Sequence, residues 1–302
     1  MFRKNSKSIR LMSIPIVLAG LLFLSVSMGA QPDQERKGSS MNKSYEPDRI
    51  KGAVPLEPIP QEVRAQFLRP GELLAIQDKF PVAFQPVGTL EWHGRQNPIG
   101  CDAIKAERLV IETAKKTGGA VMPPIYFAAD AYRDVGKGYG LGMDPEAGFQ
   151  LPGSFYQIET GLLKQFILNA CRNYLARGFK LVVIVSGHNP PIQQNLFDEI
   201  CYLLKTDDGK EPVFFTMEYT AIPEGHPKRS GDHAGGYETS MMLFLNGGRV
   251  NMKANEGQKE PDLAIYNEFP VSQATTAEGE LRFNLQVEGL ARLVQERLQR
   301  LR

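Results

Sequence analysis

Short apolar runs alternate along this chain with longer amphipathic segments, and this alternation limits the fold more than any other feature. Apolar runs of strand length predict buried strands, and segments with helical periodicity predict helices between and after them. The strands are expected at Val82–Val87, Ala120–Met122, Leu181–Val185 and Val213–Met217, and the helices at Ala103–Thr117, Gln157–Arg177, Ile192–Lys205, Tyr237–Leu245 and Glu280–Leu301. Strands that alternate with helices form parallel sheets with helices on both faces, so we expect an α/β fold with a mainly parallel sheet.

Boundary residues support the expected helices. We expect Asp102 to cap the first helix, because a short acidic side chain can accept hydrogen bonds from the free backbone N–H groups of a first turn. Gly118 and Gly119 are expected to end that helix and Gly178 to end the second, since glycine readily adopts the left-handed conformation found after helices.

The first 66 residues differ in composition from the rest of the chain. Four basic residues and no acidic residue precede the apolar stretch Leu11–Val26, and small residues follow it. This pattern predicts a secretory signal peptide over residues 1–30 and a periplasmic or secreted protein. An uncleaved membrane anchor is the alternative, because the stretch approaches the ~20 residues that span a bilayer. Residues 31–66 are polar and are expected to be a flexible linker, and residues 67–302 a single catalytic domain.

The charge balance excludes two classes of partner. Removing the four basic residues of the signal from a formal net charge of +1 leaves about −3. A chain with this balance has no basic surface to attract nucleic acid or anionic lipid. We therefore expect a small-molecule substrate, no nucleic acid, and no membrane partner once the signal is removed.

Three of the four histidines lie in short polar segments that also carry carboxylates or follow a predicted strand. The segments hold Glu91, His93 and Asp102; His188; and Asp232, His233 and Glu238. Neutral imidazole and carboxylate bind zinc, manganese and iron, and enzymes assemble such sites from distant segments. Each motif alone is a weak signal, since His188 could be a loop histidine and Asp232 with His233 a surface pair. The fourth histidine, His226, has no carboxylate at ligand spacing and is expected to be a loop residue.

Two of these segments follow predicted strands directly. Val82–Val87 leads into Glu91, and Leu181–Val185 leads into His188. Both side chains are therefore expected at the carboxyl edge of the sheet, where open parallel sheets bind ligands. Glu91 and His93 are two residues apart, so in an extended segment they point to the same side and could share one metal ion or face two. Together the motifs predict a metal centre at this edge.

Four sequence blocks carry a resemblance to a known family. They are Pro86–Gly94 closed by Pro98 and Asp102, Leu151–Ser154, Gly178–Phe179 with Ile184–His188, and His233–Gly235 with Glu238–Ser240. In this order, over about residues 70–250, they resemble the creatininase (creatinine amidohydrolase) family. The resemblance implies a three-layer α/β/α fold and two divalent metal ions, zinc or manganese, at a site that hydrolyses amide or cyclic amide C–N bonds. Iron suits the same ligand types.

The resemblance also assigns a role to each candidate residue. The expected metal ligands are Glu91, His93, Asp102, His188 and Glu238, with Asp102 as the bridge between the two ions. His233 matches the family's proton-transferring histidine and Asp232 its acidic neighbour, so these two are the candidate catalytic residues. The family commonly forms ring oligomers, and a homo-oligomer is an expectation on that ground alone.

Three positions depart from the family's pattern. Creatininase has a metal-binding glutamate two residues after the histidine that aligns with His188, and here Pro190 takes that place without a ligand atom. Gln96 stands where a histidine is usual, and Ser186 where an asparagine is usual. Creatinine itself is therefore a poor candidate substrate, and Glu238 becomes the candidate replacement for the missing ligand.

Two functions from different classes follow. The first is an exported metal-dependent amidohydrolase that acts on an amide, cyclic amide or formamide, with His233 delivering a proton to the leaving nitrogen and Asp232 orienting His233. The second is a degenerate family member that binds a small ligand without turnover, which the altered loop Asn189–Pro191 supports. The five expected metal ligands are all present, which favours the hydrolase. The loops Ala128–Phe149 and Glu218–Gly231 are expected to determine its specificity.

Overall fold

A computed structural model describes residues 52–301 except 131–132, 135–138 and 267. The expected signal peptide and residues 31–51 of the expected linker lie outside the described residues. Within the described part, residues ahead of 67 already pack on the domain, because Val63 is buried and its carbonyl oxygen accepts a hydrogen bond from the Val121 backbone nitrogen at 2.7 Å. No described helix combines the length and the apolar character that a membrane span requires.

A four-stranded parallel sheet forms the centre of the fold. Its strands lie in the order β2, β1, β5, β6, with bounds β1 Val82–Val87, β2 Ala120–Val121, β5 Leu181–Ser186 and β6 Val213–Met217. Every residue of β1 and β5 is buried, as expected for strands covered on both faces. Val87 pairs with Ser186 at the last position of β1 and β5, so both strands end at the same edge of the sheet.

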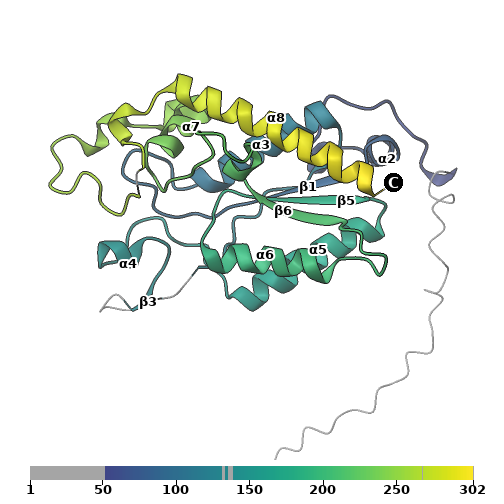
Figure 1. Cartoon of the computed structure of the whole chain (residues 1–302), viewed down its shortest axis with the longest axis horizontal. Coiled ribbons are helices and arrows are strands. Elements are labelled where there is room, and N and C mark those ends of the chain that lie inside the picture. The colour runs from purple at the N-terminus through teal and green to yellow at the C-terminus, as the bar shows by residue number, and fades with distance from the viewer. Residues whose placement is uncertain (1–51, 131–132, 135–138, 267, 302) are drawn as a thin grey trace, which may run out of the picture. The chain divides into compact units, whose positions relative to one another are not determined.

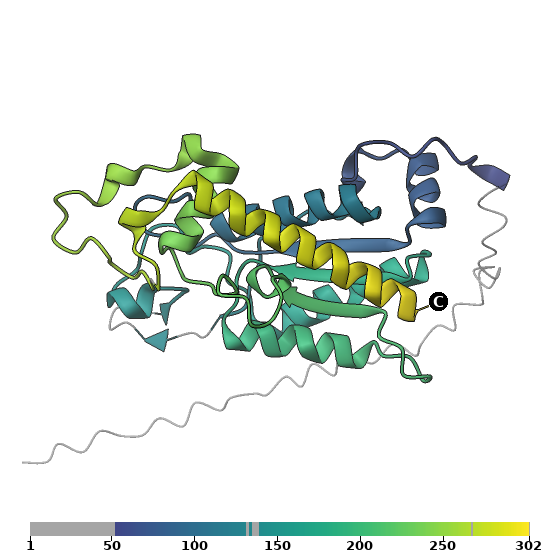
Figure 2. The same ribbon diagram turned by 45° about the horizontal axis from the view of Figure 1, so that its top comes forward.

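Helices cover both faces of this sheet. The α3, α7 and α8 helices pack on one face and α5 and α6 on the other, with bounds α3 Cys101–Thr117, α5 Thr160–Ala176, α6 Pro191–Leu203, α7 Gly236–Asn246 and α8 Thr276–Arg300 (Figures 1 and 2). Alternate strand residues belong to two separate apolar cores: Phe84 and Val183 face α3 and α8, whereas Ala83 and Ile184 face α5 and α6. The expected α/β fold with helices on both faces is confirmed.

Several short elements complete the described chain. The α2 helix, Pro70–Lys79, precedes β1, and a small antiparallel pair, β3 Arg133–Asp134 with β4 Tyr139–Gly140, leads into α4, Asp144–Ala147. Short 3-10 helices are η1 Ala65–Phe67, η2 Tyr219–Ala221, η3 Gly247–Arg249, η4 Met252–Asn255 and η5 Val271–Gln273. The α2 helix was not expected, although Pro70 at its first position and Glu72 in its first turn are both signals of a helix start. Glu72 accepts a hydrogen bond from the Arg69 backbone nitrogen at 2.8 Å.

The glycines expected to end the first two helices are confirmed, whereas the expected cap of the first helix is wrong. Gly118 ends α3 with a φ of 76°, as expected, and Gly178, with a φ of 107°, follows the end of α5. The prediction that Asp102 caps α3 is wrong, because Gly100 is the N-cap residue and Asp102 lies inside the first turn. Its carboxylate is turned towards histidine side chains instead of backbone N–H groups.

Two glycines let the strand ends reach the start of α3. A Cβ atom at Gly88 would lie 2.3 Å from the backbone nitrogen of Ala103, and one at Gly187 would lie 2.1 Å from the carbonyl oxygen of Asp102. Any side chain at either position would push the strand ends away from the helix. The close approach places Asp102 between the segments that follow β1 and β5.

Packing between α7 and α8 depends on a glycine in the same way, which gives a stability prediction. A Cβ atom at Gly279 of α8 would lie 1.9 Å from the carbonyl oxygen of Ser240 in α7, and a backbone atom cannot move aside easily. We expect Gly279→Ala to lower the free energy of unfolding by at least about 1–3 kcal/mol in urea denaturation. Gly248→Ala is the matched control, because nothing lies within 4 Å of its Cβ position. Equal effects of the two substitutions would contradict this packing argument.

Candidate metal centre

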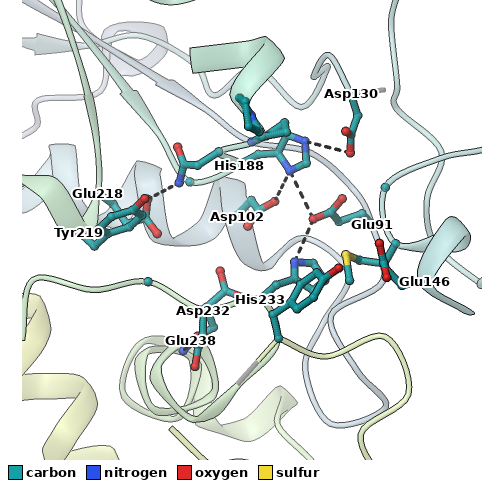
Figure 3. A pocket seen from close by; sticks show the side chains of 18 of the residues that line it. Glu91, Asp102, Asp130, Glu146, His188, Glu218, Tyr219, Asp232, His233 and Glu238 are labelled. Atoms are coloured by element: carbon teal, nitrogen blue, oxygen red, sulfur yellow. Dashed lines mark hydrogen bonds and ion pairs between the residues drawn. The ribbon is translucent and has the colours of Figure 1, made fainter. Parts of the chain in front are cut away.

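A pocket of about 410 Å³ opens at the carboxyl edge of the sheet, and its lining includes the segments that follow β1, β5 and β6 (Figure 3). Glu91, Asp102, His188 and His233 face one another in this pocket, and both carboxylates approach the same nitrogen of the His188 ring. The open-sheet rule therefore places the site correctly at the strand ends.

Glu91, Asp102 and His188 form one candidate metal position. The His188 Nδ1 atom lies 3.3 Å from Glu91 Oε1 and 3.2 Å from Asp102 Oδ2. One ligand atom from each of the three residues lies within 4.8 Å of the others, and all three side chains are buried. Glu91 Oε2 accepts no hydrogen bond from the described residues, and the polar neighbour of Asp102 Oδ2 is His188 Nδ1. A buried carboxylate oxygen without a donor, next to a second carboxylate and an imidazole, fits a divalent cation.

The carboxylates and the imidazole of this position favour the charged form of one another. Burial alone would raise the pKa values of Glu91 and Asp102, but the neighbouring imidazoles lower the first and bring the second well below its usual range. Burial alone would lower the pKa of His188, whereas Glu91 and Asp102 raise it well above its usual value. A metal ion that binds here must displace the His188 proton, because neutral imidazole is the ligand form.

His93 lies on the other side of the Asp102 carboxylate. Its Nδ1–H donates to the backbone carbonyl of Glu91 at 3.2 Å, so Nε2 is the nitrogen that faces the site. Nε2 lies 3.0 Å from Asp102 Oδ1 and 3.5 Å from Glu238 Oε2. Burial opposes a charged ring, but Asp102 and Glu238 outweigh it and raise the pKa of His93 to about 9. Asp102 thus presents one oxygen to each side, in the bridging place that the resemblance implies.

Two buried residues that the sequence analysis missed complete this side of the site. The Lys105 ammonium contacts Glu238 Oε1, lies 3.2 Å from Glu218 Oε1 and lies 3.5 Å from Asp102 Oδ1. Burial alone would lower the pKa of Lys105, but Glu218 and Glu238 raise it well above its usual value, so the side chain is a permanent cation. Both residues had a sequence signal: Lys105 follows Asp102 by one helical turn, and Glu218 directly follows β6.

His233 borders the pocket, opposite Asp102 and next to Glu91. Its Nε2–H donates to the Trp92 carbonyl at 2.8 Å, which leaves Nδ1 unprotonated and 3.4 Å from Glu91 Oε1. Burial lowers the pKa of His233, and the positive charge of His93 lowers it further. The ring is therefore neutral and presents a proton-accepting nitrogen to the pocket.

Asp232 has a different partner from the one expected. Its two carboxylate oxygens accept hydrogen bonds from the backbone nitrogens of Tyr237 and Glu238, at 2.9 and 3.0 Å, in the first turn of α7. The Trp92 carbonyl therefore orients the His233 ring, and Asp232 instead caps the first turn of α7. Burial raises the pKa of Asp232 to about 7, with the Glu238 charge acting in the same direction.

The backbone after His233 is strained and firmly held. Ala234 adopts a φ of 57°, in the left-handed region that non-glycine residues rarely occupy. Its nitrogen donates to Glu238 Oε2 at 2.7 Å, and its carbonyl accepts from Gln96 Nε2 at 2.7 Å. Gln96, one of the departures from the family's pattern, therefore fixes the segment that carries the proton-accepting histidine.

The altered loop after β5 has a structural role. Pro190 is the N-cap residue of α6 and Pro191 its first residue, a position that suits proline because no backbone N–H is needed there. Asn189 donates to Glu218 Oε2 at 2.9 Å. The loop thus brings no ligand atom to the second metal position and ties Glu218 in place instead.

Comparison with known proteins agrees with this site. The family model for creatininase, described as creatinine amidohydrolase, matches residues 68–294. The chain belongs to the creatininase family, whose members are metal-dependent amidohydrolases. It is 23% identical to the creatinine amidohydrolase of Pseudomonas putida over 248 residues, which cover 71% of this chain and 89% of that protein. The resemblance found in the sequence is confirmed.

Solved creatininase structures share the fold. A crystal structure of creatinine amidohydrolase matches with a TM-score of 0.61 at 19% identity, covering 78% of this chain and 98% of that chain. With the same coverages, a mutant creatininase described as the Zn-Zn type matches with a TM-score of 0.60 at 21% identity. A creatininase structure described as Mn matches with a TM-score of 0.60 at 19% identity. The three-layer α/β/α expectation is confirmed, and the solved relatives are described with the metals that the resemblance implied.

Removing a ligand tests the first metal position directly. We expect His188→Ala and Asp102→Ala to lower the affinity for zinc or manganese by more than the roughly 10–100-fold typical of outer-shell changes, measured by titration with a chelating competitor. His226→Ala is the control, since His226 contacts the Lys228 backbone and does not line the pocket. Unchanged affinity in both site variants would show that these residues hold no metal.

Proposed function

We propose that this protein is an exported metal-dependent amidohydrolase that cleaves a non-peptide C–N bond, in an amide, cyclic amide or formamide, of a small polar molecule. The observation that carries the proposal is the convergence of Glu91, Asp102 and His188 on one buried point, with the neutral nitrogen of His233 beside it. This arrangement supplies a cation site and a proton acceptor within one pocket, which is the minimum set for metal-assisted hydrolysis.

Glu91, Asp102 and His188 would hold a divalent ion. Zinc and manganese are the proposed ions, with iron as the alternative, because two carboxylates and an imidazole suit all three. When bound, such an ion supplies Lewis acidity towards a substrate carbonyl and towards a water molecule. His188 Nε2 lies 3.9 Å from Asp130 Oδ2, so a second carboxylate lies behind the ligand ring, as is common in metal sites.

His233 is the proposed proton carrier. Its neutral Nδ1 can accept a proton from the attacking water, and the same atom can then deliver that proton to the leaving nitrogen. The Trp92 carbonyl fixes the ring through Nε2–H, so proton transfer is confined to the nitrogen that faces the pocket. Asp232 supports this step indirectly, because it caps the helix that follows the His233 segment.

The pocket's charge indicates the kind of substrate. The side chains that the structure places around it include seven acidic residues and neither lysine nor arginine. Asp130 and Glu146 are among these lining residues (Figure 3). One divalent ion and the Lys105 ammonium supply three positive charges against these seven carboxylates, so the pocket stays acidic and we propose a neutral or positively charged small molecule.

Export and assembly into a homo-oligomer are proposed on grounds other than the pocket. Export to the periplasm or the exterior rests on the basic and apolar pattern of the first 30 residues. The proposal of a homo-oligomer rests only on the ring oligomers that are common in the family. Neither changes the chemistry proposed for the pocket.

A substrate screen with one variant tests the function. We expect the metal-loaded protein to hydrolyse at least one member of a panel of neutral and basic amides, lactams and formamides, detected by amine or ammonia release. His233→Ala should keep its bound metal and lose about 10²–10⁴-fold in kcat, because only the proton carrier is removed. His226→Ala should match the wild type.

Two outcomes would redirect the proposal. Full activity in His233→Ala would remove the proton-carrier role. Tight binding of panel members without turnover, in a protein that holds its metal, would favour the ligand-binding alternative instead.

A further inference from the structure

Lys105 is a buried cation beside the metal ligands that the proposed hydrolysis does not use. Its side chain is 1% exposed, and three carboxylates surround its ammonium: Glu238, Glu218 and Asp102. A buried ammonium is costly unless it is paired, and here the pairing is threefold. The residue is therefore fixed in charge and in position, one helical turn from the carboxylate that faces both sides of the centre.

The second metal position has few free ligand atoms. His93 and Asp102 face it, and Cys101 offers a thiol within 4.8 Å of the His93 and Glu238 ligand atoms, but Pro190 offers none. Both oxygens of Glu238 already have partners, because Oε1 contacts the Lys105 ammonium and Oε2 accepts from the Ala234 backbone nitrogen at 2.7 Å. Glu238 could ligate an ion only by giving up one of these contacts, and the second contact holds the strained Ala234.

The charge of Lys105 acts against a second ion as well. Its ammonium lies 3.5 Å from Asp102 Oδ1, the same oxygen that faces His93 at 3.0 Å. A divalent ion bound to that oxygen and to His93 would lie a few ångströms from a fixed positive charge. Repulsion at such a separation is strong inside a protein, where little solvent screens it.

We propose that the centre holds one divalent ion, between Glu91, Asp102 and His188, and that the Lys105 ammonium takes the place of a second ion. The proposal rests on the proposed metal-dependent function and replaces the two ions that the resemblance implies with one ion and one internal cation. Lys105 is then a positioning residue: it holds Asp102 and Glu238 in place and balances the carboxylates that a second ion would otherwise balance.

The number of bound ions tests this directly. The full chain is loaded with Mn²⁺ and freed of excess metal by gel filtration. Its metal content is then measured, and its electron paramagnetic resonance spectrum is recorded. We expect one equivalent of manganese and the spectrum of an isolated Mn²⁺ ion. Two equivalents with an exchange-coupled spectrum would overturn the one-ion proposal and leave the hydrolase proposal intact. No bound manganese or zinc would overturn both.

Substitution of Lys105 tests its part in this count. Lys105→Met keeps the length of the side chain and removes the charge, so we expect a second equivalent of Mn²⁺ to bind and the spectrum to become exchange-coupled. Lys115→Met, at an exposed position of the same helix, is the matched control and should stay at one equivalent. Lys105→Arg keeps the charge and should also stay at one. A folded Lys105→Met protein that still binds one ion, or a Lys105→Arg protein that binds two, would overturn the role of Lys105.

Discussion

The site depends on the contacts of the buried Asp102 carboxylate with two histidines and a lysine. Its carboxylate is buried between His93 and His188, with the Lys105 ammonium behind it. This placement requires the ends of β1 and β5 to touch the first turn of α3, which only glycine at positions 88 and 187 allows. A backbone constraint in two loops therefore determines the distance between ligands that are far apart in the sequence. The bridging geometry follows from the packing of the sheet against one helix.

Most of the fold could be predicted because its signals are local. The β1 and β6 strands match their expected bounds, and α3 begins only two residues before the prediction. Mostly apolar strands and helices ended by glycine leave few alternatives in an α/β chain. The β3–β4 pair was missed because two-residue strands have no periodicity to detect. Asp102 was misassigned as a cap because an acidic residue near a helix start has the same sequence signal whether it binds backbone N–H groups or a cation.

The residues of the site that carry motifs could be predicted from the sequence, whereas the residues that only position them could not. Glu91, His93, His188 and His233 carry motifs, and the structure brings all four to one pocket or its edge. Lys105 and Glu218 had only positional signals, one turn after Asp102 and directly after β6, and their pairing across 113 residues of sequence is visible only in the structure. The contact of Trp92 with His233 uses a backbone carbonyl, which every residue has, so no side-chain pattern could identify it. The sequence identifies the side chains that could bind a metal ion, whereas the pairing of buried charges is seen only in the three-dimensional structure.

The most direct test is anomalous diffraction from crystals of the manganese- or zinc-loaded protein. We predict one anomalous peak per chain, bounded by Glu91, Asp102 and His188, with the Lys105 ammonium still between Glu218 and Glu238. A second peak between His93 and Glu238, with Lys105 displaced, would contradict the one-ion centre. Absence of any peak in the pocket would contradict the metal centre itself.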